Sequence, residues 1–189
     1  MTQAHSTSAR AFESMTRFLE LGPGDAEILR AFAPRIDDRL PAITEAFYAR
    51  LGAEPATAPF LEGRLEGLKK THLAWLRSLF SGEYGEAFFQ RQFEVGQVHV
   101  RVELDSLWVD SVMNILRTEL FRAILETASD RQEAVAVYSA VLKVMDTALM
   151  VINLAYNEHR LDLIHDVTGM PRALLERLIQ VGVGNSRQS

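Results

Sequence analysis

Hydrophobic residues recur at spacings of three and four along most of the chain, a pattern typical of helices that bury one face. In one segment this stripe consists of Ile36, Leu40, Ile43, Phe47 and Leu51. We find no segment that alternates apolar and polar residues between hairpin turn signals, which would indicate strands. The pattern therefore predicts an all-α protein.

Glycine and proline set the limits of the expected helices, because both disfavour the helix interior. No proline occurs between Pro59 and Pro171, and no glycine occurs between Gly96 and Gly169. We expect helices over residues 8–19, from 23 onward, and over 34–51, 61–80, 86–102, 106–128 and 131–165. A short amphipathic helix should follow the break at 169–171.

The helix expected over residues 131–165 is too long for the body of the protein. Its apolar stripe consists of Val135, Tyr138, Leu142, Met145, Leu149, Ile152 and Tyr156. At 1.5 Å per residue it would be about 50 Å long, whereas a compact domain of this size is about 40 Å across. This helix should therefore project from the body or pack along a partner.

Composition narrows the classes of protein. The chain has 189 residues, 48% of them apolar, and a formal net charge of −5 without a concentrated basic face, so we expect no nucleic-acid partner. We expect no membrane span, because no run of about 18 apolar residues is evident. The chain has no cysteine and no signal-peptide pattern, which is compatible with a cytoplasmic protein.

His99 lies in the middle of an apolar helical segment, "EVGQVHVRVELDSLW". One interpretation is a core histidine bonded to a backbone carbonyl; the other is a single axial ligand to haem iron. Gly96, one turn earlier, would let a flat macrocycle approach the helix, or would let two helices pack closely.

Three further residues could form the opposite wall of such a site. Tyr48 is either a buried tyrosine with a satisfied hydroxyl or a hydrogen-bond donor to a bound gas. Leu68 and Thr71 share one helical face and form either a wall of mixed polarity or ordinary packing, with the threonine bonded to its own helix. His72, one position off this face, is a boundary residue or a second iron ligand.

Taken together, these segments resemble the sensor globins of globin-coupled sensors and protoglobins. The similarity covers about residues 34–156. It is most specific in "W-x-x-x-L-F-x-G-x-Y" at Trp75–Tyr84 and "x-G-x-x-H-x-R" at Val95–Arg101. Two departures stand out: Glu103 replaces a frequent glycine, and Trp108–Val109 replaces a frequent Trp-Tyr pair.

The resemblance implies a globin-like helical sandwich with an extra N-terminal helix, holding haem b. His99 would be the proximal iron ligand, and Tyr48, assisted by Thr71, would donate a hydrogen bond to O2, or to CO or NO. Phe47, Leu68, Gly96 and Trp108 would also line the haem. The last two long helices would form a homodimer.

The implied organisation is a sensor domain over residues 1–165, followed over 166–189 by a linker or the start of an output domain such as a cyclase or kinase. The sensor itself would bind gas without catalysing a reaction. Two alternatives remain open: a haemless globin-like interaction module, and a haem-dependent redox enzyme of the dioxygenase type.

Overall fold

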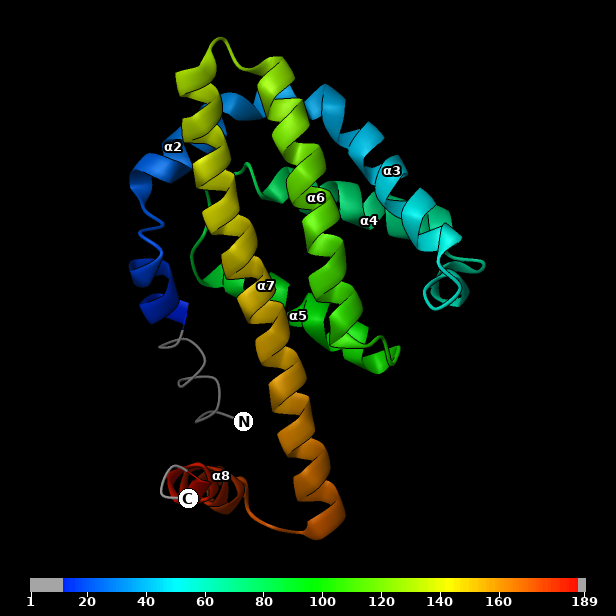
Figure 1. Cartoon of the computed structure of the whole chain (residues 1–189), viewed down its shortest axis with the longest axis vertical. Coiled ribbons are helices and arrows are strands. Elements are labelled where there is room, and N and C mark those ends of the chain that lie inside the picture. The colour runs from blue at the N-terminus through cyan, green and yellow to red at the C-terminus, as the bar shows by residue number, and fades with distance from the viewer. Residues whose placement is uncertain (1–11, 187–189) are drawn as a thin grey trace.

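The computed structural model describes residues 12–186, with side chains as far as residue 181, and every regular element within that range is helical (Figure 1). Residues 12–18 are helical; the expected start of this helix at Ser8 lies outside the described residues. The later helices are α2 (Pro23–Ile36), α3 (Leu40–Ala53), α4 (Leu65–Ser78), α5 (Glu86–Arg101), α6 (Ser106–Thr127), α7 (Arg131–Thr168) and α8 (Arg172–Ser186). The prediction of an all-α fold is confirmed.

The boundary between α2 and α3 differs from the one expected at Pro34. Pro34 lies inside the last turns of α2, and one 3₁₀ turn over Asp37–Arg39 separates α2 from α3. The proline that opens α3 is instead Pro41, which occupies the first helical turn, where a missing N–H costs nothing. Both prolines are acceptable in a first turn, so the sequence alone pointed to the wrong one.

The start of α4 also differs from the prediction: the helix begins at Leu65, whereas the sequence predicts a start at residue 61. Ala58–Leu61 form a separate 3₁₀ turn, and Gly63 has a φ of +69°, which interrupts the helix before Leu65. This left-handed conformation is readily available to glycine because it has no Cβ. Gly63, the first of the two glycines in "LEGRLEGL", therefore ends the 3₁₀ turn and separates it from α4.

Side-chain caps fix the ends of α6 and α7 close to the expected residues. The Asp105 carboxylate accepts a hydrogen bond from the Leu107 backbone N–H over 2.8 Å, and the Asp130 carboxylate accepts one from the Glu133 backbone N–H over 2.9 Å. At its other end α7 continues to Thr168, three residues beyond the expected end. There Gly169 adopts a φ of +68° and donates its N–H to the His165 carbonyl over 2.7 Å.

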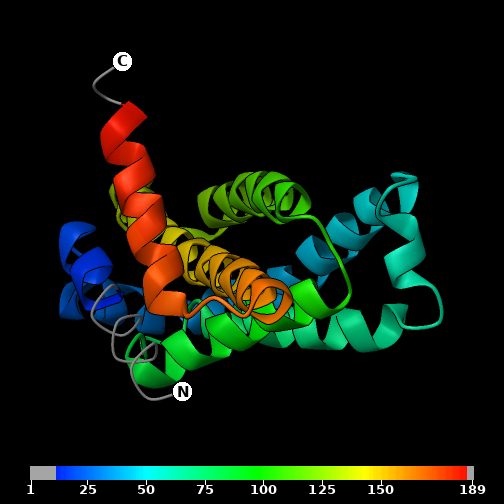
Figure 2. The ribbon, with the colours of Figure 1, turned by 90° about the horizontal axis from the view of Figure 1, so that it is seen from below.

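The helices form two layers around α7. In Figure 1, α6 and α7 lie side by side across the front of the molecule, and in Figure 2 α4 and α5 lie on the opposite side. The most extensive packing of α7 is with α5, followed by α6 and α2, while α4 packs on α3. Beyond Ala155 α7 leaves this core, and α8 folds across its projecting end. The long projecting helix predicted from its apolar stripe is confirmed.

By length and composition alone, α7 is also apolar enough to cross a membrane, which corrects the expectation that no segment reaches this threshold. Half of its most apolar window is buried within the protein, among the other helices. A helix at the centre of a packed core meets the same criterion, since it is apolar on most sides.

Candidate functional site

His99 lies in the last turns of α5, on a helix held firmly against α7. Its imidazole is largely buried, and burial lowers its pKa, so the neutral form is favoured at pH 7. Its Nδ1 atom is fully buried and has no hydrogen-bond partner among the described residues. A core histidine bonded to a carbonyl, the alternative considered above, would have had such a partner. A neutral imidazole without a protein partner is suited to ligate a metal.

Gly96 packs against α7, the second of the two roles considered for it above. A Cβ built at this position would lie 2.6 Å from the Ile152 carbonyl oxygen and 2.7 Å from the Cβ of Ala155, both on α7. Any larger residue would push α5 away from α7. Gly96 therefore permits close helix packing, which in turn fixes the position of the helix that carries His99.

An aromatic cluster joins α3 to α4. It consists of Phe47 and Tyr48, in the second half of α3, and His72 and Trp75 of α4. The Phe47 and His72 rings are stacked with centroids 4.3 Å apart, and the Tyr48 ring meets His72 edge-on at 5.6 Å. Tyr48 is only 8% exposed, and burial raises its pKa to about 12, so its hydroxyl keeps its proton. That hydroxyl has no hydrogen-bond partner among the described residues, which leaves it free to donate.

His72 is half-buried as a residue, as the boundary interpretation expects. Burial lowers the pKa of His72 to about 4, and its Nδ1 lies 3.1 Å from the Thr44 Oγ1. Its Nε2 is buried and has no partner among residues 12–186. If Thr44 donates to Nδ1, Nε2 carries a hydrogen and is a donor; in the other tautomer Nε2 offers a lone pair.

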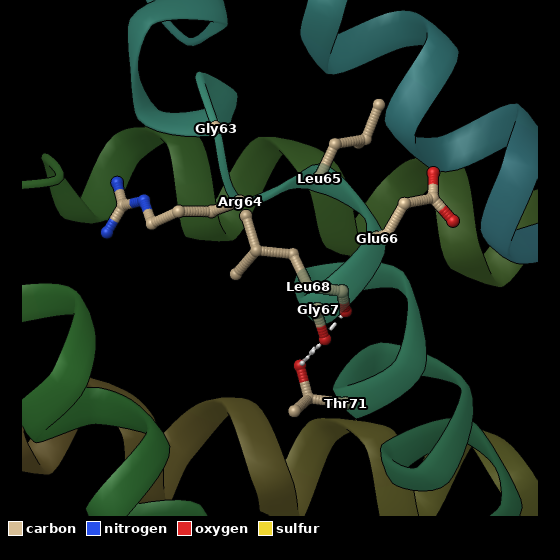
Figure 3. Close-up of a pocket in the computed structure, with 7 residues that line it drawn as sticks. All are labelled: Gly63, Arg64, Leu65, Glu66, Gly67, Leu68 and Thr71. Atoms are coloured by element: carbon tan, nitrogen blue, oxygen red, sulfur yellow. Dashed lines mark hydrogen bonds between the residues drawn. The ribbon is translucent and has the colours of Figure 1, made fainter.

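Leu68 and Thr71 line a hollow of about 750 Å³ beside the first turns of α4 (Figure 3). The hollow is broadly open to solvent, and most of the residues that line it are exposed. The Thr71 hydroxyl lies 2.9 Å from the Leu68 carbonyl and 3.2 Å from the Gly67 carbonyl, within hydrogen-bond distance of both. Thr71 is therefore bonded to its own helix, the alternative considered above for this residue.

A hydrogen bond joins the helix that carries His72 to the helix that carries His99. The Trp75 indole N–H donates to the Gln92 side-chain oxygen over 2.8 Å, and Gln92 is fully buried. An indole nitrogen can only donate, so the amide oxygen of Gln92 faces Trp75, and its NH₂ group is left buried without a partner. Gln92 lies seven positions before His99, on the same helical face, but nothing in the sequence indicates Trp75 as its partner.

The turn after His99 is fastened to α7. The Tyr156 hydroxyl donates to the Leu104 carbonyl over 2.8 Å, and the Leu104 N–H donates to the His99 carbonyl over 3.1 Å. Between them Glu103 has a φ of +57°. Tyr156 was expected only as part of an apolar stripe, and its polar role depends on a contact 52 residues away. Trp108 is half-buried in the first turn of α6, and within the part of the chain that the structure describes it has no ring contact or side-chain hydrogen bond with the other candidates.

The residues present fit a haem. His99 offers a neutral imidazole, and Nδ1 of His99, Nε2 of His72 and the Gln92 amide are buried polar groups without partners. Native proteins rarely leave such groups unsatisfied unless a ligand, water or ion completes them. Leu68 lines an open hollow beside α4, and the neighbouring cluster of Phe47 and His72 is aromatic; the hollow itself is not lined by His99 or Tyr48.

Comparison with known proteins identifies the class. The sequence profile of the Protoglobin family matches residues 8–161. The chain therefore belongs to the Protoglobin family, and the resemblance inferred from the two motifs is confirmed.

Solved structures agree with this assignment. The globin domain of a globin-coupled sensor from Geobacter sulfurreducens is 29% identical, with a TM-score of 0.72, and the match covers 76% of this chain and 96% of that one. The ferrous globin domain of DosC from E. coli is 23% identical with a TM-score of 0.62, over 76% of this chain and 97% of that one. The DosC match, at this identity, shows the fold alone, and the globin-like architecture is confirmed.

Proposed function

We propose that this chain is a haem-based oxygen sensor domain in which His99 is the proximal ligand of haem b. The observation that carries this proposal is the His99 imidazole, which burial keeps neutral and which has no protein partner among the described residues. Membership of the Protoglobin family and the likeness to a globin-coupled sensor domain support the same role. The domain binds a gas and catalyses no reaction of its own.

Haem supplies an iron centre that reversibly binds O2, CO or NO. The protein's own residues would hold the haem and determine which gas binds best. His99 would offer an imidazole nitrogen to the iron from a helix that Gly96 allows to pack closely on α7. Tyr48 would donate a hydrogen bond to the gas from a hydroxyl that stays protonated at physiological pH. Phe47, Leu68 and Trp108 would contribute apolar surface, and Thr71 would assist Tyr48 only weakly, because its hydroxyl is engaged by its own helix.

For signalling, we infer a homodimer formed by α6 and α7. Apolar side chains are exposed near the corner where these helices meet: Phe121 is 41% exposed, Leu125 49% and Val135 59%. Exposed apolar surface of this kind commonly marks an interface. Met145 belongs to the apolar stripe expected to face a partner, but it is fully buried in the chain's own core. Val135, from the same stripe, is exposed and remains available for the interface.

We further propose that residues 1–165 form the sensor and that 166–189 lead toward an output domain. The family profile ends at residue 161, inside α7, so α7 itself would continue from the sensor into the connecting segment. A shift of α5 on gas binding would then reach the dimer through its contact with α7.

The test is an absorption spectrum of the reduced full chain under argon, O2 and CO. We expect a Soret band that shifts with each gas in the wild type, and loss or weak retention of haem in His99→Ala. His159→Ala, which removes an exposed histidine from the projecting part of α7, is the matched control and should behave as wild type.

Three outcomes would contradict the proposal. A colourless protein that cannot be reconstituted with haem would indicate the interaction module. Rapid oxidation with turnover of nitric oxide to nitrate would indicate the redox enzyme. Unchanged spectra in His99→Ala would move the ligand assignment to His72.

A further inference from the structure

The hollow beside α4 has the chemical character of a site for an amphipathic acid. Leu65 and Leu68 supply apolar surface, and Arg64 and Glu66 are its charged side chains (Figure 3). In the close-up Arg64 and Glu66 extend to opposite sides of the hollow, so the two charges do not pair with each other. A ligand there would meet an apolar wall flanked by separate charges.

A second cation beside the hollow is already engaged by acidic residues. The Lys69 Nζ lies 3.5 Å from a Glu66 carboxylate oxygen and 2.7 Å from a Glu45 carboxylate oxygen. Lys69 is therefore shared between two carboxylates and is not available to a ligand. One lysine cannot balance two carboxylates, so Glu66 keeps part of its negative charge, on the side of the hollow opposite Arg64.

Arg64 differs because it has no carboxylate partner within residues 12–186. One of its terminal nitrogens donates to the Phe60 carbonyl over 2.8 Å, which restrains the guanidinium at the edge of the hollow. A guanidinium has five N–H groups in a planar fork that matches a carboxylate. After the bond to Phe60 the remaining N–H groups are free to bind one.

We propose that Arg64 binds a carboxylate of the cofactor, a haem propionate, at this hollow; the inference rests on the proposed haem-binding function. Haem is a largely apolar disc with two carboxylates on one edge. A cation beside leucine side chains therefore complements both parts of it. Lys69 is excluded by its two acidic partners, which leaves Arg64 as the cation of the hollow that can accept an acid.

The experiment compares hemin with hemin dimethyl ester, in which both carboxylates are blocked. Wild type, Arg64→Ala and Arg64→Lys, each as the full chain, are loaded with either compound. The rate of transfer to excess apomyoglobin is then followed by absorbance. Arg91→Ala is the matched control, since Arg91 is an exposed arginine of α5 that does not line the hollow.

With hemin, Arg64→Ala should lose the cofactor roughly two- to fivefold faster, as expected for a partly exposed ion pair. Arg64→Lys should lie between it and wild type, because a lysine keeps the charge but not the fork. With the dimethyl ester the three proteins should lose the cofactor at the same rate, and Arg91→Ala should match wild type with both compounds.

Equal rates for wild type and Arg64→Ala with hemin would overturn the inference while leaving the haem proposal intact. An equal increase with hemin and with the ester would also overturn it, because the arginine would then act on the fold and not on a carboxylate. Failure of the wild type to retain hemin at all would overturn the haem proposal, and this inference with it.

Discussion

Trp75 of α4 and Gln92 of α5 are joined by a 2.8 Å hydrogen bond from the indole N–H to the amide oxygen, in the interior of the protein. Trp75 lies seven positions after Leu68 on α4, and Gln92 lies seven positions before His99 on α5. Residues seven positions apart share a helical face, so each partner lies on the same face as a candidate haem-facing residue. The bond therefore ties together the two walls that the proposed cofactor would separate.

Replacing Gln92 tests this link. Gln92→Leu leaves the Trp75 N–H without an acceptor, so we expect the free energy of unfolding to fall by about 1 kcal/mol. Urea denaturation measures this. Trp75→Phe with and without Gln92→Leu completes a double-mutant cycle, and additive losses would mean that the bond contributes nothing.

Gln92→Glu should make stability depend on pH. The site is fully buried, and among the described residues the side chain at position 92 is bonded only by the Trp75 indole, so the pKa of the new carboxyl should be raised above its unfolded value of about 4.3. A raised pKa favours the folded state below the unfolded value and loses that advantage as pH rises through the folded pKa. The variant should therefore unfold at lower urea at pH 8 than at pH 5, by a margin absent in wild type.

Glu103→Gly should stabilise the protein by about 0.5 kcal/mol. Glu103 has a φ of +57°, a conformation that costs a non-glycine residue about 1–2 kcal/mol, partly offset by the greater freedom of glycine in the unfolded chain. The measurement is the urea midpoint. Glu103→Val, with a β-branched side chain, should be less stable than wild type, and a stable valine variant would contradict the explanation.

Tyr48→Phe should raise the O2 dissociation rate by about ten- to a hundredfold, because a hydrogen bond to a charged acceptor contributes roughly 1.5–3 kcal/mol. CO binds with little charge separation, so CO dissociation should change much less. Stopped-flow replacement of O2 by CO gives the rates. The wild-type rate should not vary between pH 6 and 9, since the Tyr48 pKa is about 12.

Thr71→Val provides the comparison for Tyr48. The Thr71 hydroxyl is already engaged by carbonyls of its own helix, so its removal should change O2 dissociation less than the loss of the Tyr48 hydroxyl. A large effect of Thr71→Val or His72→Ala beside an unchanged Tyr48→Phe would show that the donor has been misassigned.

The homodimer can be tested at Leu125 and Val135, which are exposed in the single chain. Leu125→Glu with Val135→Glu should convert a dimer into a monomer at micromolar concentration, by light scattering after size exclusion, because two charges would be buried at the interface. Haem content should not change. Phe18→Glu alters a more exposed apolar residue away from this corner and should leave the dimer intact. A wild-type monomer would refute the prediction.

The sequence by itself determined the helical class and most of the helix ends. It also singled out His99 as the candidate haem ligand. These features are local: glycine, proline and capping aspartates act within one or two turns, and the spacing of apolar residues records which face is buried. Two helix starts were expected too early. The start of α3 was misplaced because Pro34 and Pro41 both satisfy the local rule for opening a helix, and the start of α4 because a separate 3₁₀ turn and Gly63 precede it.

Only the tertiary structure decided what the candidate residues touch. Gly96 meets Ile152 and Ala155, Tyr156 reaches Leu104, and Trp75 finds Gln92, through contacts 17 to 59 positions apart along the chain. Met145 was expected at a partner surface, yet it is fully buried in the chain's own core. Helical periodicity shows that a residue belongs to an apolar face, but which helix covers that face depends on how α7 packs against its neighbours, and distant segments of the chain determine this packing.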